Sequence, residues 1–582
     1  MSIFSSIRGP KLRRNTFNLG HENKLTLDQS WLVPFYWADI VPGDRWFASL
    51  AFQMQMLVQK APVMHRVNVY FHWFFVPYRL VWDDWKTFIT GGEDGNQTPI
   101  FPRFQINSFT NVLEFMKPGS LCDYLGIPCP QTFGYTKASD SSAWNIIPFN
   151  LLPFRAYHLI WNEYYRNQNL QDEFKFSHDS GIFLDLIANN NELANLLTLR
   201  RHNWEKDYFT SALPWTQRGG DVSLPIQTTI SGTETYDVRY ESPGSGSRAD
   251  HQRYRFFRST DGTESPVIPG LSGNYDDVQF DQTRTTNDAG ANVGGATLSP
   301  KSAPDLISDV DPRGTLKVDV DFSRADLDAD TMITINDLRR ANKLQEWLER
   351  NARGGSRYIE QILSHFGVKS SDARLQRPEF LGGGKAPVSF TQVLQTSQTT
   401  DTSPQGQQTG YGSAGGSSFG FKKRFEEHGI LMGIMFVQPR TAYCQGLPKV
   451  FQKFDKFDYY WPEFAHLGEQ PIQNMELYMD WKGVDNNLDK LKETFGYTPR
   501  YSEYKFEPSR VHGQFLTSLD YWHMARKFAN KPSLNSQFVE AQDIRRIYPV
   551  VDEDADNHAL YCQMYVNLKA NRLMPRFGTP ML

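Results

Sequence analysis

Residues 61–92 show two hydrophobic periods in succession. From 66 to 76 the odd positions are all apolar, whereas the even positions begin polar, with Asn68 and His72, and end apolar. Such alternation predicts a long strand with one face fully buried. The period then changes to that of a helix, which Gly91 ends and which we expect to be heavily buried along Val81, Trp82, Trp85, Phe88 and Ile89.

The same two periods predict further elements along the chain. One helix is expected within 152–170, where a single face would hold Phe154, Tyr157, Trp161, Tyr164 and Tyr165. Two more are expected within 335–367, separated at Gly354 and Gly355, with apolar faces formed by Leu338, Ala341, Leu344 and Leu348 and by Ile359, Ile362, Leu363 and Phe366. Strand-like runs return at 429–440 and 558–570, so we expect a sheet built from both ends of the chain.

Two segments are rich in small and polar residues. From about 216 to 330 the composition shifts toward Gly, Ser, Thr and Asp, with few apolar stretches for a core of its own. We interpret this segment as a surface insertion, and long insertions usually carry function. A second segment, 395–420, is of low complexity.

Composition favours a mainly β protein. Aromatic residues make up 14% of the 582 residues, with 42 glycines and 33 prolines, a mixture typical of strands and long loops. Cysteines are too few for a disulfide scaffold, and Cys122 and Cys129 lack C-x-x-C spacing. We therefore expect buried free thiols at Cys122, Cys129, Cys444 and Cys562.

Charge and hydropathy restrict the partners of the chain. A formal net charge of −4 cannot neutralise a nucleic acid in bulk, so any DNA contact must be local. Apolar runs stay well short of the roughly 20 residues of a membrane helix, so we expect no membrane insertion. The first residues lack the apolar core of a signal peptide, which predicts maturation in a reducing cytosol.

The strongest metal motif is an incomplete calcium loop. Asp326, Asp328 and Asp330 match its first acidic positions. The turn glycine is replaced by Thr331, and the bidentate glutamate by Asp337. We therefore expect no bound metal and no cofactor, and we interpret the segment as a solvated acidic turn that caps the following helix.

Motifs for phosphate binding and catalysis are also incomplete. The segment LGGGKAPVS, 381–389, resembles a phosphate loop, but Glu379 and Ala386 stand where such a loop needs glycine and a hydroxyl residue, so we predict a flexible turn. Nucleophile-elbow and metalloprotease motifs are missing from the sequence. Paired carboxylates are common on solvated surfaces and give weak grounds for an enzyme; such pairs are Asp83 with Asp84 and Glu426 with Glu427.

A basic cluster lies on the N-terminal arm, at Arg8, Lys11, Arg13 and Arg14. Such an arm could neutralise a few phosphates of DNA without reading their sequence. A merely solubilising tail explains the same charges equally well. Charge patterning alone leaves both interpretations open.

Long strings of the sequence point to one viral family. They are PGD (42–44), APVMHRVNVYFHWFFVPYRLVWDDW (61–85), RGGSRYIEQILSHFGVKSSDARLQRPEFLGG (353–383), FGYTPRYSEYKFEPSRVHGQF (495–515), SLDYWHMARKF (518–528) and MPRFGTPML (574–582). These strings resemble the major capsid protein of the Microviridae, in its gokushovirus-like branch. None of them falls between 216 and 330.

The resemblance implies a mainly β fold, an eight-stranded antiparallel jelly roll of viral capsid type with long helical and loop insertions. The N-terminal arm and the first part of the body would occupy 1–215, and a helical connection and the rest of the body 331–582. The insertion at 216–330 would form a protrusion at threefold axes and contribute to host attachment.

The resemblance also implies a structural role without catalysis. The chain would self-assemble into a small T=1 icosahedral shell around circular single-stranded DNA, in the cytoplasm of a bacterial host, and remain in the virion. Expected partners are other copies of the chain, the packaged DNA, a small basic DNA-associated protein, a DNA pilot protein and a host surface receptor, with carbohydrate as one candidate. The arm residues Arg8, Lys11, Arg13 and Arg14 would then contact the DNA.

Two other classes of function stay open at this point. A carbohydrate-binding β-sandwich would need a platform of exposed aromatics in the insertion, such as Tyr236, Tyr240 and Tyr275. A hydrolase would use paired carboxylates and would lose turnover on substitution of a single Asp or Glu. Sugar binding by isolated monomers would favour the first.

Overall fold

The computed structural model describes the chain as two compact units. It covers residues 14–105, 115–134, 147–183, 192–220, 222, 228–241, 253–258, 279–286, 292–299, 307–310, 316–326, 335–397, 399, 405–481, 489–549 and 558–577, and between 228 and 337 it describes the backbone alone. One unit, the body, combines Met1–Gly219 with Leu348–Leu582. The other, the inserted unit, is Gly220–Trp347.

The first sheet of the body joins strands from both ends of the chain, as predicted. Its main order is β1–β24–β4–β17–β16, while β2 also pairs with β24 and β18 with β4. All of these pairs are antiparallel. The strands are β1 (Asn15–Asn18), β2 (His21–Leu27), β4 (Arg45–Met56), β16 (Ser389–Leu394), β17 (Gln408–Ser417), β18 (Phe421–Arg424) and β24 (Leu560–Arg572).

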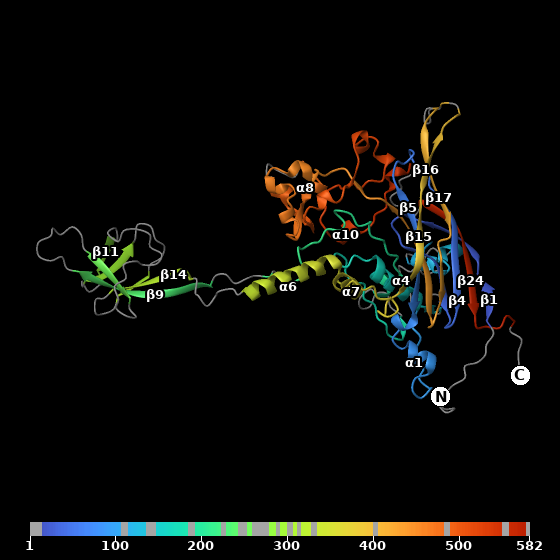
Figure 1. Ribbon diagram of the computed structural model, residues 1–582, viewed down its shortest axis with the longest axis horizontal. Coiled ribbons are helices and arrows are strands. Elements are labelled where there is room, and N and C mark those ends of the chain that lie inside the picture. Colours follow the sequence, from blue (N-terminus) through green and yellow to red (C-terminus); the bar gives the residue numbers. More distant parts are fainter. Residues whose placement is uncertain are drawn as a thin grey trace. The chain divides into compact units, whose positions relative to one another are not determined.

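The second sheet has the antiparallel order β15–β5–β19–β3. Its strands are β3 (Val33–Ile40), β5 (Val67–Pro77), β15 (Glu379–Pro387) and β19 (Gly429–Pro439). Successive strands alternate between the two sheets from β2 to β5, since β2 and β4 belong to the first sheet and β3 and β5 to the second. Later in the chain β15 and β19 belong to the second sheet, and β16, β17, β18 and β24 to the first. The prediction of a mainly β fold with antiparallel sheets is confirmed (Figure 1).

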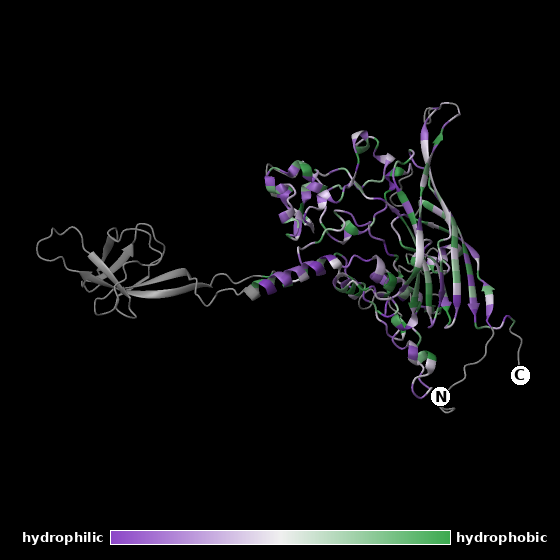
Figure 2. Ribbon diagram, viewed as in Figure 1, coloured by the Kyte–Doolittle hydropathy of each residue, from purple (hydrophilic) through white to green (hydrophobic). Residues whose placement is uncertain are grey.

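Side chains from both sheets meet in one hydrophobic core. The ring centroids of Phe52 on β4 and Phe71 on β5 lie 4.5 Å apart, and Phe419 stacks on Phe71 at 5.5 Å. Burial alternates along β4 and β24, so the predicted alternation from Leu560 to Leu568 is confirmed. Hydrophobic and hydrophilic residues follow one another along the strands of the first sheet in Figure 2. The core is therefore a sandwich of two inward-facing strand surfaces.

The second sheet is buried on its other face as well. Phe74 and Val76 of β5 belong to a separate core cluster with Phe154 and Tyr157 of helix α4. The predicted fully buried face of β5 is confirmed, and a helical layer covers the other face. That layer contains α3 (Leu121–Tyr124), α4 (Leu152–Ile160), a π-helical turn (Trp161–Tyr165) and α5 (Glu192–Leu197).

The helix predicted after β5 is shorter and more exposed than expected. Val81 and Trp82 are fully buried but precede α1 (Trp85–Thr90), which contains no buried residue. Gly91 ends α1 in the left-handed conformation, at φ 81°, as predicted. The expectation of a heavily buried helix is wrong because the two buried residues belong to the turn that joins strand and helix.

Two segments interpreted as turn or low complexity are strands. The segment 381–389 lies mostly in β15, which pairs with β5, and part of 395–420 forms β17. A Cβ at Gly383 would come 2.2 Å from the carbonyl oxygen of Phe71, and one at Gly412 would come 2.6 Å from the sulfur of Met56. Glycine therefore lets these strands approach large neighbours, and the predicted flexible turn is wrong.

A long connection between β19 and β24 forms a smaller core together with residues 208–212; this core includes Phe209, Tyr443, Phe495 and Phe538. Its elements are β20 (Ala442–Tyr443) paired with β23 (Ser509–Arg510), β21 (Glu469–Gln473) paired with β22 (Thr494–Pro499), and helices α8 (Asn474–Leu477), α9 (Asp489–Lys492) and α10 (Ser536–Val539). Elsewhere in the body β6 (Arg103–Phe104) pairs with β7 (Phe149–Asn150) and β8 (Ile182–Phe183).

The inserted unit contains paired strands that its composition did not indicate. Their orders are β10–β9–β14–β13 and β11–β12. The strands are β9 (Thr228–Glu241), β10 (Arg253–Arg258), β11 (Gln279–Thr286), β12 (Asn292–Ser299), β13 (Ile307–Val310) and β14 (Leu316–Asp326). The two helices predicted after this segment are confirmed as α6 (Ile335–Gly354) and α7 (Tyr358–Phe366).

The four cysteines are free, as expected. Cys122, Cys129 and Cys562 are buried, whereas Cys444 is half-buried. Burial raises the pKa of the Cys562 thiol to about 12. Among the described residues, no helix is long and apolar enough to cross a bilayer.

Candidate assembly and nucleic-acid surfaces

The first sheet leaves one face exposed, which we call the open face. Alternate residues of β4, from Arg45 to Gln55, point away from the core, and the pairing register places outward residues of β24 beside them. Figure 1 shows the helices of the body on the side of β5 and β15, with β4, β24 and β1 at the opposite margin. The open face is thus accessible in the single subunit, unlike the outer face of the second sheet.

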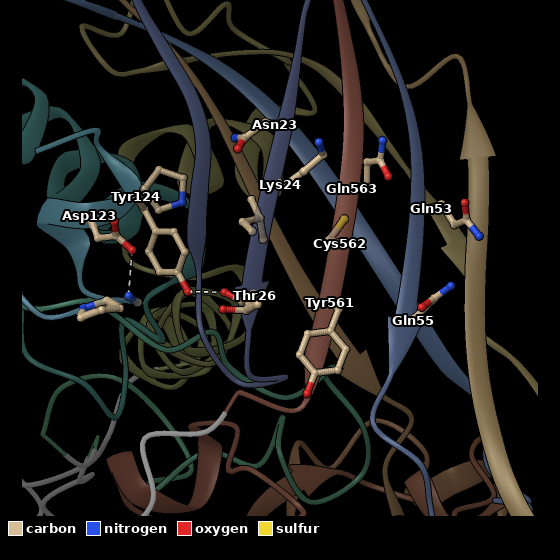
Figure 3. A pocket seen from close by; sticks show the side chains of 14 residues that line it. Asn23, Lys24, Thr26, Gln53, Gln55, Asp123, Tyr124, Tyr561, Cys562 and Gln563 are labelled. Carbon is tan, nitrogen blue, oxygen red and sulfur yellow. Dashed lines mark hydrogen bonds between the residues drawn. The ribbon is translucent and has the colours of Figure 1, made fainter. Parts of the chain in front are cut away.

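One end of the open face is rich in amides and phenols. Gln53 of β4 lies opposite Gln563 of β24, and Gln55 lies opposite Tyr561. On the other side of β24, Lys24 of β2 pairs with Gln563. These side chains line a hollow of about 520 Å³ (Figure 3).

The wall of the hollow comes from the segment around α3. The hydroxyl of Tyr124 donates to the carbonyl of Thr26 at 2.7 Å, which holds this segment against β2. The carboxylate of Asp123 accepts the backbone N–H of Gly119 at 2.8 Å. Its charge is therefore partly satisfied within the wall.

Charges on the open face have almost one sign. Its cations are Lys24, Arg45, Lys422, Arg424 and Lys569, and its one carboxylate among the described residues of these strands is Glu22. The Glu22 carboxylate lies 3.7 Å from the ammonium of Lys24. A chain with a net charge of −4 thus concentrates cations on this face.

The cationic end of the face contains a like-charge pair. Arg424 of β18 lies directly opposite Arg45 of β4, and Lys422 and Lys569 flank Phe47 from the two sides. Like charges directly opposite each other in a sheet are destabilising. An anion between them would relieve this repulsion.

The turn before β4 holds this end of the sheet in place. Gly43, in the PGD motif, adopts φ 88°, and its N–H donates to the carbonyl of Phe425 at 2.8 Å. The buried carboxylate of Asp44 accepts the Nε–H of Arg572 at 2.8 Å and the indole N–H of Trp46 at 3.0 Å. The motif therefore ties the start of β4 to the end of β24.

The predicted basic arm meets this end of the sheet at its one described residue. Arg14 donates from Nη1 to the carbonyl of Gly43 at 2.5 Å and directly precedes β1. Arg8, Lys11 and Arg13 lie outside the described residues. Their DNA contact stays a prediction.

The other predicted site residues belong to the inserted unit. Asp326 is the last residue of β14, whereas Asp328 and Asp330 lie outside the described residues, so the calcium motif is untested. Tyr236 and Tyr240 lie in β9, opposite Arg258 and Tyr254 of β10. Tyr275 also lies outside the described residues.

The connection between β19 and β24 carries an exposed apolar region, which we call the aromatic surface. Phe454 is 92% exposed, a large fraction for a phenylalanine in a folded chain. The surface comprises Val450, Phe451, Phe454, Phe457, Tyr459, Tyr460, Trp461 and Leu467. Exposed apolar patches of this kind mark interaction sites.

Local contacts hold the aromatic surface in shape. The indole N–H of Trp461 donates to the carbonyl of Lys456 at 2.8 Å. The ammonium of Lys453 lies 3.4 Å from the carboxylate of Glu503 and 3.9 Å from the ring centroid of Tyr504. These bonds indicate an ordered apolar surface, suited to binding a preformed partner.

Comparisons with known proteins agree with this geometry. The family model described as capsid protein (F protein) matches residues 5–582. The chain belongs to the phage capsid F protein family. The resemblance to Microviridae capsid proteins is thereby confirmed.

Three relatives of this F-family chain are each named capsid protein VP1. That of Chlamydia phage 1 is 34% identical over 609 residues, covering 99% of this chain and 97% of the relative. That of Bdellovibrio phage phiMH2K is 36% identical over 544 residues, covering 92% and 90%. That of Spiroplasma virus 4 is 27% identical over 594 residues, covering 99% and 97%. These relatives are structural capsid proteins, not enzymes.

Acidic pairs in this F-family chain serve structural contacts. The carboxylate of Glu427 accepts the Nε–H of Arg79 at 2.7 Å, and that of Asp84 accepts the hydroxyl of Ser180 at 2.6 Å. Among the described residues, no three His, Cys, Asp or Glu side chains gather as metal ligands would. The hydrolase alternative therefore gains no support from the geometry.

Sequence reasoning missed both surfaces of the capsid chain. The open face alternates with core residues, so its outward Gln, Tyr and Lys residues looked like an ordinary solvated strand face. A usable signal was the lack of carboxylates at the outward positions of 45–55 and 561–571. The aromatic surface was detectable as the unusually aromatic stretch KVFQKFDKFDYYWPEF, 449–464.

Proposed function

We propose that this chain is the major structural subunit of a closed T=1 icosahedral shell around circular single-stranded DNA. The observation that carries the proposal is the aromatic surface, since a chain that exposes Phe454 almost fully needs a partner to cover it. Other copies of the same chain are the partner that a capsid protein provides. The strand order of the two sheets supports an eight-stranded jelly roll as the building block of the shell.

The finer assignments follow from the same proposal. The subunit assembles in the cytoplasm of a bacterial host and stays in the virion, together with a small basic DNA-associated protein and a DNA pilot protein. The arm residues Arg8, Lys11, Arg13 and Arg14 contact the packaged DNA. The insertion at 216–330 protrudes at threefold axes and contributes to attachment to a host receptor, with carbohydrate as one candidate.

Electron microscopy of the purified protein tests assembly. Closed, uniform shells, seen with and without nuclease treatment and matched by fast sedimentation, are the expected result. Monomers alone, in the presence of DNA and the partner proteins, would refute the shell.

Substitutions in the aromatic surface test the observation that carries the proposal. Phe451→Ser with Phe454→Ser should leave the free energy of unfolding of the monomer within about 0.5 kcal/mol, because both side chains are largely exposed. The same pair should reduce the yield of shells at least tenfold. Phe133→Ser, also on an exposed ring but outside the aromatic surface, is the control. Equal shell yields from both variants would exclude this surface from assembly.

Two further variants test the finer assignments. Deleting about 244–295 should spare assembly more than infectivity, and failure of assembly with aggregated monomers would show that the segment is not a surface insertion. Alanine at Arg8, Lys11, Arg13 and Arg14 should lower the DNA content of purified particles without unfolding the body. An unchanged DNA content would reject the arm as a DNA contact.

A further inference from the structure

We propose that the open face of the first sheet binds the single-stranded DNA directly, with its cations on phosphates and its amides and phenols on bases. This inference rests on the proposed enclosure of single-stranded DNA by the shell. It assigns the contact to the folded sheet, in addition to the basic arm. Five observations of the subunit carry it.

The first observation is the sign of the charge. Five cations stand on the open face against a single carboxylate, Glu22, among the described residues of its strands, although the whole chain is acidic by four charges. A random distribution of 61 basic and 65 acidic residues would place the two signs about equally. Phosphate neutralisation is the chemistry that a one-sign face serves.

The second observation is the like-charge pair at one end. Arg45 and Arg424 lie directly opposite each other on paired strands, which costs stability in the single subunit. Asn571 and Lys422 are neighbours of Arg45 and Phe47 in the same register, and neither brings a carboxylate. A phosphate group between the two guanidinium groups would convert this repulsion into attraction.

The third observation is the amide group at the other end. Gln53, Gln55 and Gln563 carry both a donor and an acceptor, as the edges of bases do. Among the described residues, none forms a hydrogen bond with these three amides, so all three are available to a ligand. Amide side chains that face one another across strands suit unpaired bases, whose edges are not already paired.

The fourth observation is the placement of the phenols. Tyr561 and Tyr565 lie two pleats apart on β24, both about half exposed, and both point to the open face. Aromatic side chains on an open sheet are the stacking platforms of single-strand binding proteins. The hollow of about 520 Å³ beside Tyr561 leaves room for a base next to the sheet.

The fifth observation is continuity with the arm. Arg14 is bonded to Gly43 at the cationic end of the sheet, so the predicted arm begins where Arg45 and Arg424 stand. A second copy of the chain is a poorer occupant of this face, because protein interfaces are depleted in lysine at their centre and enriched in apolar anchors. The aromatic surface has those anchors, whereas the open face has amides and cations.

The test measures binding of a fluorescent single-stranded oligonucleotide to the purified full chain as a function of salt. The variant Arg45→Gln, Lys422→Gln, Arg424→Gln, Lys569→Gln removes the cationic end. A control removes the same charge from exposed lysines elsewhere in the body, with Lys86→Gln, Lys206→Gln, Lys369→Gln, Lys490→Gln. Urea unfolding midpoints of both variants check that the body still folds.

The open-face variant should lose at least tenfold in affinity at moderate salt. Its slope of log K against log salt should become shallower by about 3, because single strands release roughly 0.7 counterions per neutralised phosphate. The control variant should keep the slope of the unaltered chain. Tyr561→Leu with Tyr565→Leu should weaken binding about tenfold while leaving the slope unchanged, because stacking carries no charge.

Outcomes that overturn the inference are distinct from those that overturn the shell. Equal losses in the open-face and control variants would mean that the face attracts DNA only by overall charge. Unchanged DNA binding together with lost assembly would make the open face an interface between copies. In either case closed shells from the unaltered chain would leave the proposed function standing. Shells of normal size with reduced DNA content, formed by the open-face variant, would support the inference.

Discussion

Replacing Arg572 by glutamine should destabilise the body by about 3 kcal/mol, although this residue ends the last strand of the sheet. Its Nε–H donates to the carboxylate of Asp44 at 2.8 Å, and its Nη2 donates to the carbonyl of Asp39 at 2.9 Å. The guanidinium also lies over the ring of Trp46, at 5.1 Å from its centroid. One side chain thus joins the end of β24 to the turn before β4.

The magnitude follows from unequal burial of the two charges. The Asp44 side chain is 1% exposed, and its Oδ1 has no hydrogen-bond partner among the described atoms, so loss of Arg572 leaves a buried carboxylate that only Trp46 and a backbone N–H satisfy. Breaking such a pair costs about 3–5 kcal/mol. Asp44→Asn should cost less, about 1.5 kcal/mol, because the 19% exposed guanidinium can reach water and keeps the Asp39 carbonyl.

Urea unfolding of the purified subunit measures these free energies. The double variant Asp44→Asn with Arg572→Gln should be less destabilised than the sum of the single variants, by at least about 1 kcal/mol. Arg45→Gln is the control, since Arg45 is adjacent in sequence but exposed, and its removal relieves the like-charge pair. A loss below about 1 kcal/mol for Arg572→Gln, or strictly additive effects, would refute the buried pair.

Three further predictions concern the body. Burial and the nearby Arg200 lower the pKa of His158 to about 3, so below pH 6.5 the unfolded chain binds this proton and the folded chain does not. The free energy of unfolding, measured with urea, should therefore fall by about 2 kcal/mol between pH 7 and pH 5, and by less in His158→Gln. Gly384→Val should destabilise by more than about 2 kcal/mol, since its Cβ would lie 2.3 Å from the ring of Phe419. The control Gly415→Ala in β17 should not, because its Cβ would lie 3.5 Å from the carbonyl oxygen of Phe52, at ordinary contact distance. A thiol reagent should label Cys444 before the buried Cys562 in native protein, and equal rates would contradict the burial of β24.

Long periodic elements were predictable because their own residues determine them. β5, β24, α6 and α7 were all expected from alternation or helical spacing, and their bounds agree closely with the structure. The glycine-rich strands β15 and β17 were not, since their side chains carry no hydrophobic pattern. Their place is set by large neighbours such as Phe71 and Met56, which lie far away in the sequence and leave no space for a Cβ.

The candidate surfaces were harder to predict than the fold. The basic arm stood out because its charges are consecutive in sequence, whereas the cations of the open face come from β2, β4, β18 and β24. Only the strand register brings Arg45 opposite Arg424, and a single sequence does not give that register. A site built by cross-strand pairing is therefore invisible to spacing rules, even when each of its strands is correctly predicted.

The two sheets differ in what lies against their outer faces, and the proposed functions of the subunit follow this difference. Along β5 neither set of alternate residues is exposed, because the second sheet has the core on one side and α4 on the other. Along β4 the outward set stays largely exposed and includes Arg45, Gln53 and Gln55, so these side chains are accessible to a ligand. Aromatic residues accordingly concentrate in the core and in the aromatic surface of the connection, where protein is to be covered by protein. The first sheet carries amides and cations at many of its outward positions, so we expect substitution at Phe454 to alter assembly and substitution at Arg45 to alter DNA binding.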